Sequence, residues 1–149
     1  MADTTLEMMK SETIKEGYEM QSLSFGKSIY ILLITDHLTG CAKNLQEYLN
    51  NNTDITADLV NNLDDTTKKA YLKCVDFLII VGMLYNDENY KSIQAVKKTN
   101  SCAYVIMYAS LDSVIRDICR EQNIKYTYNR YHCMEDFVTY MRLIHSQYY

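Results

Sequence analysis

A carboxylate, hydroxyl groups and a guanidinium each stand at the end of an apolar run of this sequence. Such groups could together hold a metal ion and an anion, because carboxylates are preferred ligands of Mg²⁺ and a guanidinium is a fork of donors. One run, DFLIIVGML at 76–84, ends without an acid: Val81 and Gly82 stand there, and Asp87 comes several residues later. The remaining side chains of this candidate group are Thr35, Asp36, Tyr108, Ser110 and Arg130.

Other common chemistries lack their motifs. The five cysteines form no CxxC pair, and no histidine lies near one of them at zinc spacing. No Walker loop, GxGxxG or GxSxG motif occurs, so nucleotide hydrolysis, dinucleotide binding and serine hydrolysis lack support. We therefore expect no metal site, no cofactor and no catalytic residue. Most cysteines fall within apolar patterns, and we interpret them as reduced, buried thiols.

Composition narrows the class of protein. The 149 residues are 48% hydrophobic and 23% charged, which is enough apolar material for one domain with a proper core. The formal net charge of -4 argues against a nucleic-acid surface, which needs clustered basic residues. No apolar stretch reaches the roughly 20 residues of a membrane span. We expect no membrane association and a cytoplasmic location.

Apolar runs alternate with segments of helical periodicity from Ser28 onward. This alternation predicts an α/β domain at 28–149 with a five-stranded, doubly wound parallel sheet and helices on both faces. The run at 55–60 is the least apolar, so it should lie nearer an edge. Residues 1–27 should form an N-terminal arm, partly helical or disordered. The expected strands are 28–35, 55–60, 76–84, 102–109 and 124–129, and the expected helices are 36–51, 64–74, 88–99, 111–122 and 134–146.

The order of these segments resembles the receiver domain of bacterial two-component response regulators, over about 28–148. The first strand of a receiver runs into a pair of acids, where this chain has Thr35 and Asp36. The third strand typically reads D-L-I-I-L-D, with the phospho-accepting aspartate last, and the matching segment here is Asp76-Phe-Leu-Ile-Ile-Val81. A hydroxyl residue and an alanine that end the fourth strand are matched by Tyr108-Ala109. An invariant lysine is matched by Arg130.

The resemblance implies a receiver scaffold without its chemistry. Val81 cannot accept a phosphoryl group, and Asp36 alone of the acids survives near its place. The implied function is that of a pseudo-receiver, a phosphorylation-independent, non-enzymatic protein-interaction module in signal transduction. Its vestigial pocket would comprise Thr35, Asp36, Val81, Asp87, Tyr108, Ser110 and Arg130. An ion pair between Asp36 and Arg130 would close that pocket.

The predicted partner is another protein or a second copy of the chain. In receivers the fourth helix, fifth strand and fifth helix form the commonest partner or dimer surface, and here they would display Tyr126, Tyr128, Tyr131 and Tyr140. Tyrosine suits interfaces because it offers a stiff ring with a polar tip. The alternative is a flavodoxin-like or phosphocarrier-type enzyme or ligand-binding protein that uses the strand-end loops, such as Thr39-Gly40-Cys41.

Overall fold

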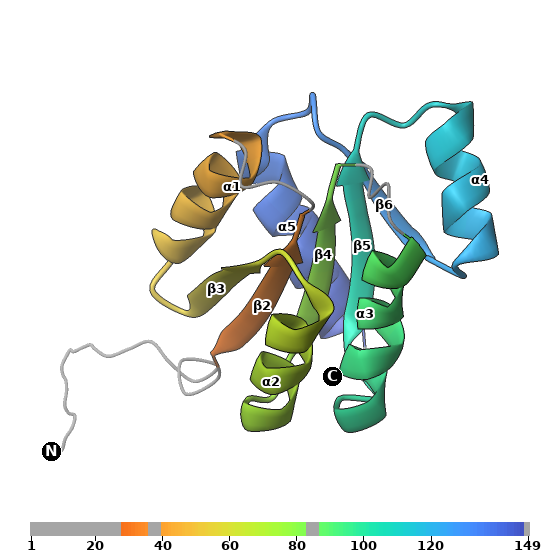
Figure 1. Cartoon of the computed structure of the whole chain (residues 1–149). Helices are drawn as coiled ribbons and strands as arrows, with labels where there is room; N and C mark the ends of the chain where they lie inside the picture. Colours follow the sequence, from red (N-terminus) through yellow and green to blue (C-terminus); the bar gives the residue numbers. More distant parts are fainter. Residues whose placement is uncertain (1–27, 36–39, 83–86, 148–149) are drawn as a thin grey trace, which may run out of the picture.

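The computed structural model describes residues 28–35, 40–82 and 87–147, with the backbone alone at 87–89 (Figure 1). The predicted N-terminal arm at 1–27 lies outside the described residues. Five parallel strands form one sheet in the order β3-β2-β4-β5-β6. This confirms the predicted α/β fold. The strands are β2 (Ile29–Ile34), β3 (Ile55–Val60), β4 (Phe77–Val81), β5 (Tyr104–Ala109) and β6 (Tyr126–Asn129).

The strand order reverses between β2 and β4, so the chain winds outward in both directions from the middle of the sheet. In doubly wound sheets this reversal opens a crevice outside the carboxyl ends of the two strands. Every residue of β2 and β4 is buried, which explains their continuous apolar sequence. The edge strand β3 alternates between buried and more exposed residues, as its weaker apolar pattern predicts.

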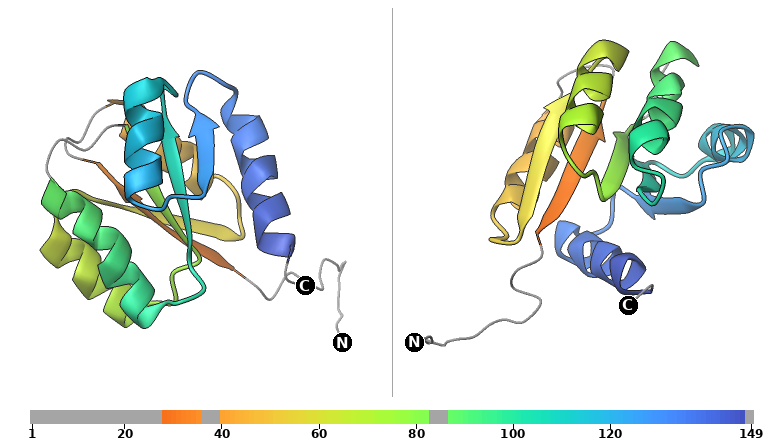
Figure 2. Two further views of the ribbon diagram at one scale, coloured as in Figure 1. Left: turned by 90° about the vertical axis from the view of Figure 1, so that its right-hand side faces the viewer. Right: turned by 90° about the horizontal axis from the view of Figure 1, so that it is seen from below.

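Helices cover both faces of the sheet (Figures 1 and 2). On one face, α1 (Gly40–Asn50) and α5 (Met134–Ser146) enclose a core that includes Leu45 and Phe137. On the other face, α2 (Leu63–Leu72), α3 (Asp87–Thr99) and α4 (Ser113–Glu121) enclose a second core that includes Ile115. Successive strand side chains point to opposite faces, so β2, β3, β4 and β5 contribute to both cores, whereas β6 contributes Tyr128 to the first.

Capping residues set the ends of α4. The side chain of Asp112 accepts a hydrogen bond from the backbone N–H of Ile115, which places the helix start at Ser113, two residues later than predicted. Asn123 has a φ of 59°, and the N–H of Ile124 donates to the carbonyl of Cys119 in a Schellman-type ending. This turn delays β6 to Tyr126, whereas the apolar run predicted a strand from Ile124.

The cysteines differ from the prediction that most are buried. All five are free thiols, but four are exposed, and Cys119 is the buried one. In α1 the buried side chains are Ala42, Leu45 and Leu49, and the neighbouring Cys41 is exposed to solvent. The exposed cysteines are Cys41, Cys74, Cys102 and Cys133.

Polar side chains bind neighbouring elements together. Asn50, at the end of α1, both accepts from the N–H and donates to the carbonyl of Ala57 in β3, at 2.7 and 3.0 Å. Arg142 of α5 forms two hydrogen bonds with Asp54, just before β3, at 2.6 and 2.9 Å. No helix in the described ranges is long and apolar enough to cross a membrane.

Candidate functional site

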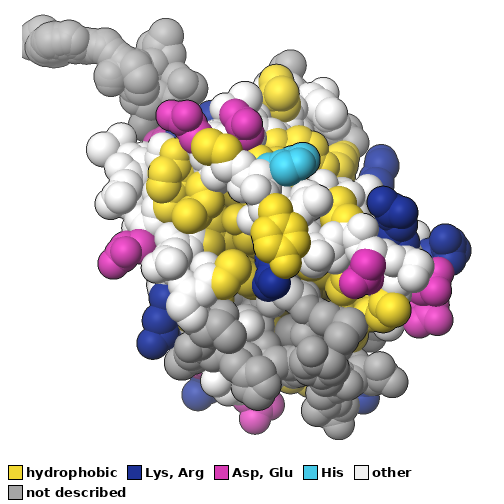
Figure 3. Space-filling view, turned by 90° about the horizontal axis from the view of Figure 1, so that it is seen from above, with side chains coloured by type: hydrophobic (Ala, Val, Ile, Leu, Met, Phe, Trp, Pro, Cys, Tyr) yellow, Lys and Arg dark blue, Asp and Glu magenta, His cyan; other side chains and the backbone are white. Residues whose placement is uncertain are grey.

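The carboxyl ends of the strands form the edge at which the sequence predicts a site (Figure 3). Hydrophobic side chains, among them tyrosine and cysteine in this colouring, gather in the middle of this face, and acidic side chains lie nearer its border. We call the strand-end residues Thr35, Val81, Tyr108, Ser110, Arg130 and Tyr131 the carboxyl edge. Asp36 lies outside the described residues, as does the side chain of Asp87.

Val81 ends the middle strand of the sheet and is 5% exposed. It lies opposite Tyr108 in the register of β4 and β5. The next residue, Gly82, has a φ of 79°, which favours glycine, and its N–H donates to the carbonyl of Tyr108. The end of β4 is therefore a buried hydrocarbon side chain that belongs to the core, followed by a glycine in the left-handed conformation.

Tyr108 fills the space beside Val81 and is 3% exposed. Its ring stacks on that of Tyr128 at 5.9 Å and meets the ring of Phe137 edge-on at 5.0 Å. Burial is the main reason that the pKa of the Tyr108 hydroxyl is raised to about 12. Nearby Cys41 adds to the rise, while the charge of Arg130 opposes it. Tyr108 is thus a neutral aromatic core residue at neutral pH.

Arg130, Tyr131 and Ser110 come together at the same edge. The Arg130 guanidinium donates to the Tyr131 hydroxyl at 3.2 Å and lies 5.1 Å from the centre of its ring. This hydrogen bond, with a second one from Ser110, holds the pKa of Tyr131 below its ordinary value. The Tyr131 N–H donates to the Asn129 side chain, which fixes the turn after β6. The edge therefore presents a cation paired with a phenol.

The structure leaves part of the predicted pocket untested. Thr35 is buried, and its N–H donates to the carbonyl of Val60 at 3.2 Å. The predicted ion pair between Asp36 and Arg130 stays a prediction. Within the described ranges, no group of three or more His, Cys, Asp or Glu side chains is placed to hold a metal ion.

The four tyrosines predicted to share a partner surface do not form one patch. Tyr131 is 71% exposed at the carboxyl edge, whereas Tyr126 lies half-buried at the opposite end of β6. Tyr128 is buried beneath α5, where its hydroxyl donates to the carbonyl of Cys133, so its predicted display is wrong. Tyr140 is half-buried against Tyr128. Alternation along β6 turns residues 126 and 128 toward α5, which the count of tyrosines could not reveal.

Comparison with solved structures identifies the fold. The signal receiver domain of an HD domain-containing protein from Pseudomonas fluorescens Pf-5 matches 78% of this chain and 94% of its own, with 14% identity and a TM-score of 0.63. A response regulator from Burkholderia pseudomallei, solved with a phosphorylated aspartic acid, calcium ion and citrate, matches over 80% and 72%, with 15% identity and a TM-score of 0.60. This chain has the receiver-domain fold.

A structure described as an adenylate cyclase from Rhodopirellula baltica also shares the receiver-like fold, over 78% of this chain and 86% of that one. Its identity is 13% and its TM-score 0.59. No protein-family model and no curated protein sequence matches the chain. The likeness is therefore one of fold, and the residues of the carboxyl edge must carry any argument about function.

Sequence reasoning missed the role of Tyr131 at the receiver-like edge. We predicted it as a partner-surface residue, and the structure makes it the hydrogen-bond partner of Arg130. The signal was its position directly after Arg130 in the turn that follows β6. Sequence reasoning also missed Cys41 and Cys133, which lie close enough to Tyr108 to influence its pKa. Cys133 directly precedes the predicted helix 134–146, but the predicted helix 36–51 put Cys41 in its interior, whereas α1 begins at Gly40.

Proposed function

We propose that the chain is a non-catalytic, receiver-like regulatory module that binds another protein without being phosphorylated. The observation that carries the proposal is Val81. A receiver accepts its phosphoryl group on a carboxylate at the end of the middle strand, and here that position holds a buried hydrocarbon side chain. A valine has no lone pair with which to attack phosphorus, so the usual reaction has no nucleophile there.

The neighbouring residues support the same reading. Tyr108 stands where a receiver has its small hydroxyl residue, and its ring fills the interior of the edge. Arg130 stands where a receiver has its lysine, and its guanidinium is engaged by the Tyr131 phenol. A bound phosphoryl group would need free space at the position of Tyr108 and an unengaged cation at the position of Arg130. The pocket is therefore replaced by packing and by an internal hydrogen bond.

The proposed binding surface combines α4, β6 and α5. Two large hydrophobic side chains are exposed on its helices, Val114 at 53% and Leu143 at 62%. Tyr140 adds a half-buried ring on α5. Exposed apolar groups beside tyrosines suit a protein partner, because burying them on association removes apolar area from water. The partner is a second copy of the chain or another protein with a matching apolar surface.

Mass spectrometry of the intact protein tests phosphorylation independence. After incubation with acetyl phosphate and Mg²⁺ the full chain should show no phosphoryl adduct. Asp36→Ala and Asp87→Ala variants are run in parallel. A hydroxylamine-sensitive adduct that disappears in one variant would falsify the proposal, since it would show that a displaced carboxylate reacts.

Sedimentation velocity tests the surface. If the partner is a second copy, the full chain should associate with rising concentration, and Leu143→Ser should weaken that association. Leu72→Ser is the matched control, because Leu72 is 75% exposed but lies on α2, on the other face of the sheet. Equal effects of the two substitutions would contradict a specific surface. A strict monomer would exclude the homodimer and leave a different protein as partner.

A further inference from the structure

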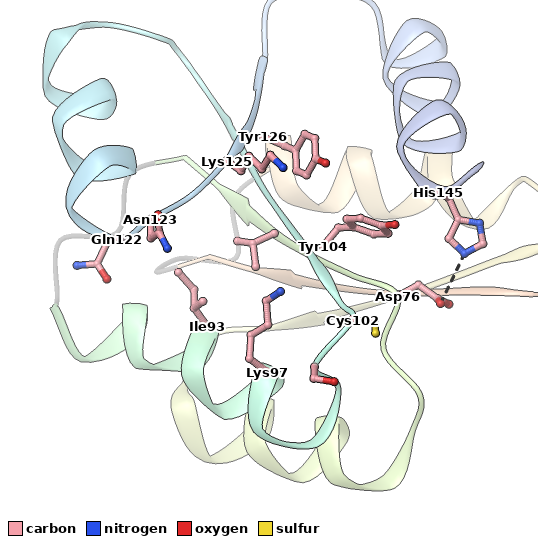
Figure 4. Close-up of a pocket in the computed structure, with 12 residues that line it drawn as sticks. Asp76, Ile93, Lys97, Cys102, Tyr104, Gln122, Asn123, Lys125, Tyr126 and His145 are labelled. Atoms are coloured by element: carbon pink, nitrogen blue, oxygen red, sulfur yellow. Dashed lines mark ion pairs between the residues drawn. The ribbon is translucent and has the colours of Figure 1, made fainter. Parts of the chain in front are cut away.

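A concave site lies at the amino ends of the strands, opposite the carboxyl edge. It is a cleft of about 890 Å³ between α3, the turn before β6 and the last turn of α5. Ligand sites commonly measure roughly 300–1,000 Å³. Figure 4 shows side chains reaching into it from these separate elements, Lys97 and Ile93 from α3 and His145 from α5. We call this space the amino-edge cleft.

The amino-edge cleft has more basic than acidic side chains, whereas the whole chain is acidic. Two lysines, Lys97 and Lys125, line it together with one acid, Asp76, and with His145, although the chain carries a formal net charge of -4. The Asp76 carboxylate already accepts from the Tyr30 N–H at 2.9 Å and lies 3.7 Å from the His145 imidazole. Among the described residues, neither lysine forms an ion pair with a carboxylate. The cleft thus offers two ammonium groups to an anion.

Aromatic rings form the wall beside these cations. Tyr104 and Tyr126 meet edge-on with 6.0 Å between ring centres, and both are half-buried, which leaves part of each ring facing the cleft. The Lys125 ammonium lies 5.6 Å from the centre of the Tyr126 ring. Phe77 backs Tyr104 at 5.3 Å. Rings supported in this way can take a planar group against them at little entropic cost.

Amide side chains complete the lining. Gln122 and Asn123 stand at the end of α4, and Asn123 is held by its left-handed turn. An amide both donates and accepts hydrogen bonds, so these two residues suit the polar edge of a heterocyclic or substituted ring. Cations, half-buried rings and amides in one cleft point to a single kind of ligand, a planar ring that carries a negative charge.

We propose that the amino-edge cleft binds a small anion with a planar aromatic ring, either a mononucleotide or an aromatic carboxylate. The ring lies against Tyr104 and Tyr126, and the anionic group lies between Lys97 and Lys125. This inference does not rest on the proposed function, because it uses no residue of the carboxyl edge and neither Val114 nor Leu143, although Tyr126 and His145 belong to β6 and α5 of the proposed partner surface. It would add a ligand-binding site to a receiver-like scaffold.

Two-dimensional ¹H–¹⁵N NMR of the full chain tests the proposal with four probes: adenosine monophosphate, salicylate, adenosine and inorganic phosphate. We expect saturable shifts at the amides of 102–105 and 122–126 with at least one of the first two probes. Adenosine and phosphate, each lacking one of the two features, should bind more weakly. Preference between the first two probes decides between a nucleotide and an aromatic carboxylate. Absence of saturable shifts with both, or shifts located elsewhere, overturns the proposal.

Substitutions test whether binding depends on the lysines of the cleft or on positive charge anywhere on this surface. Lys97→Gln combined with Lys125→Gln should weaken binding of the charged probe roughly tenfold, the size expected of two partly solvated ion pairs. Lys98→Gln is the matched control: it removes the neighbouring exposed charge of α3 from outside the cleft. Tyr126→Phe should retain binding and Tyr126→Ala should weaken it. An equal loss in Lys98→Gln, or no loss in the double variant, contradicts the proposal.

Discussion

At the scale of single residues, polar side chains of the carboxyl edge interact with one another and are therefore less available to an external ligand. Arg130 could bind an external anion, but its guanidinium has a partner within the next residue, Tyr131. The Ser110 hydroxyl also lies close enough to this phenol to lower its pKa. Hydrogen bonds donated to an oxygen favour its ionised form. The three side chains therefore form a self-contained polar group on the surface.

This arrangement predicts a shifted pKa for one tyrosine, Tyr131. Tyr131 should ionise at lower pH than an ordinary tyrosine, because the Arg130 and Ser110 hydrogen bonds lower its pKa. Arg130→Gln should move the titration back toward the ordinary value, as followed by NMR of ¹³C-labelled tyrosine rings. Arg120→Gln is the control, since Arg120 is an exposed arginine paired with Asp117 on α4. A Tyr131 titration that does not respond to Arg130→Gln would contradict the hydrogen-bonded geometry.

At the scale of elements, the sequence predicted the strands of the sheet better than it predicted where individual helices and strands begin and end. Apolar runs such as FLIIV in β4 predict strands because both of their faces are buried. The boundaries of α4 and β6 depended on Asp112 and on the turn at Asn123, which are local hydrogen-bonding choices that periodicity does not record. Alternation places Tyr126 and Tyr128 on one face of β6 wherever that strand begins. The sequence pattern did not show that α5 covers this face, so it could not show which tyrosines are buried.

We expect the Asn50 side chain to stabilise the edge strand β3. This side chain forms two hydrogen bonds with the backbone of Ala57, as a neighbouring strand would. Asn50→Ala should leave the Ala57 N–H without its partner, while the Ala57 carbonyl keeps a hydrogen bond from Gln46. It should lower the free energy of unfolding by about 1–2 kcal/mol and speed amide exchange at Ala57. Asn51→Ala changes the adjacent exposed asparagine and should have little effect. Equal exchange rates at Ala57 in both variants would show that the contact contributes nothing.

The link between α5 and β3 predicts a pH-dependent contribution to stability. The hydrogen bonds from Arg142 lower the pKa of Asp54 in the folded protein. Because the folded pKa lies below the unfolded one, the stabilisation is present above the unfolded pKa, about 3.9, and is lost as the pH falls through the folded pKa. Asp54→Asn should therefore reduce stability at pH 7 by about 0.5–1 kcal/mol, a size that allows for partial exposure to solvent.

Urea unfolding of the wild-type protein and of Asp54→Asn from pH 7 to pH 3 checks this expectation, and the two curves should converge at the acidic end. Asp117→Asn removes a more exposed ion pair on α4 and serves as the control, with little change at any pH. A difference between wild type and Asp54→Asn that grows as the pH falls would have the wrong sign and would contradict the assignment.

At the scale of the whole molecule, one sheet separates two cores and joins them. Leu45 of α1 packs in one core and Ile115 of α4 in the other, yet β2, β3, β4 and β5 supply side chains to both cores. Residues of successive strand positions point alternately to each core. Loss of either core would expose a face of these four strands. The two cores should therefore unfold together, although their side chains do not touch across the sheet.

Leu45→Ala and Ile115→Ala test this coupling. Each truncates a side chain that is at most 3% exposed and should lower the free energy of unfolding by about 2–4 kcal/mol through lost burial and a residual cavity. In the double variant the losses should add, because the sites share no contacts across the sheet. Urea unfolding followed by both far-UV circular dichroism and tyrosine fluorescence should give coincident single transitions in each variant. Separate transitions for the two probes would mean that one helical face unfolds while the sheet persists, and the molecule would then contain two independently stable layers.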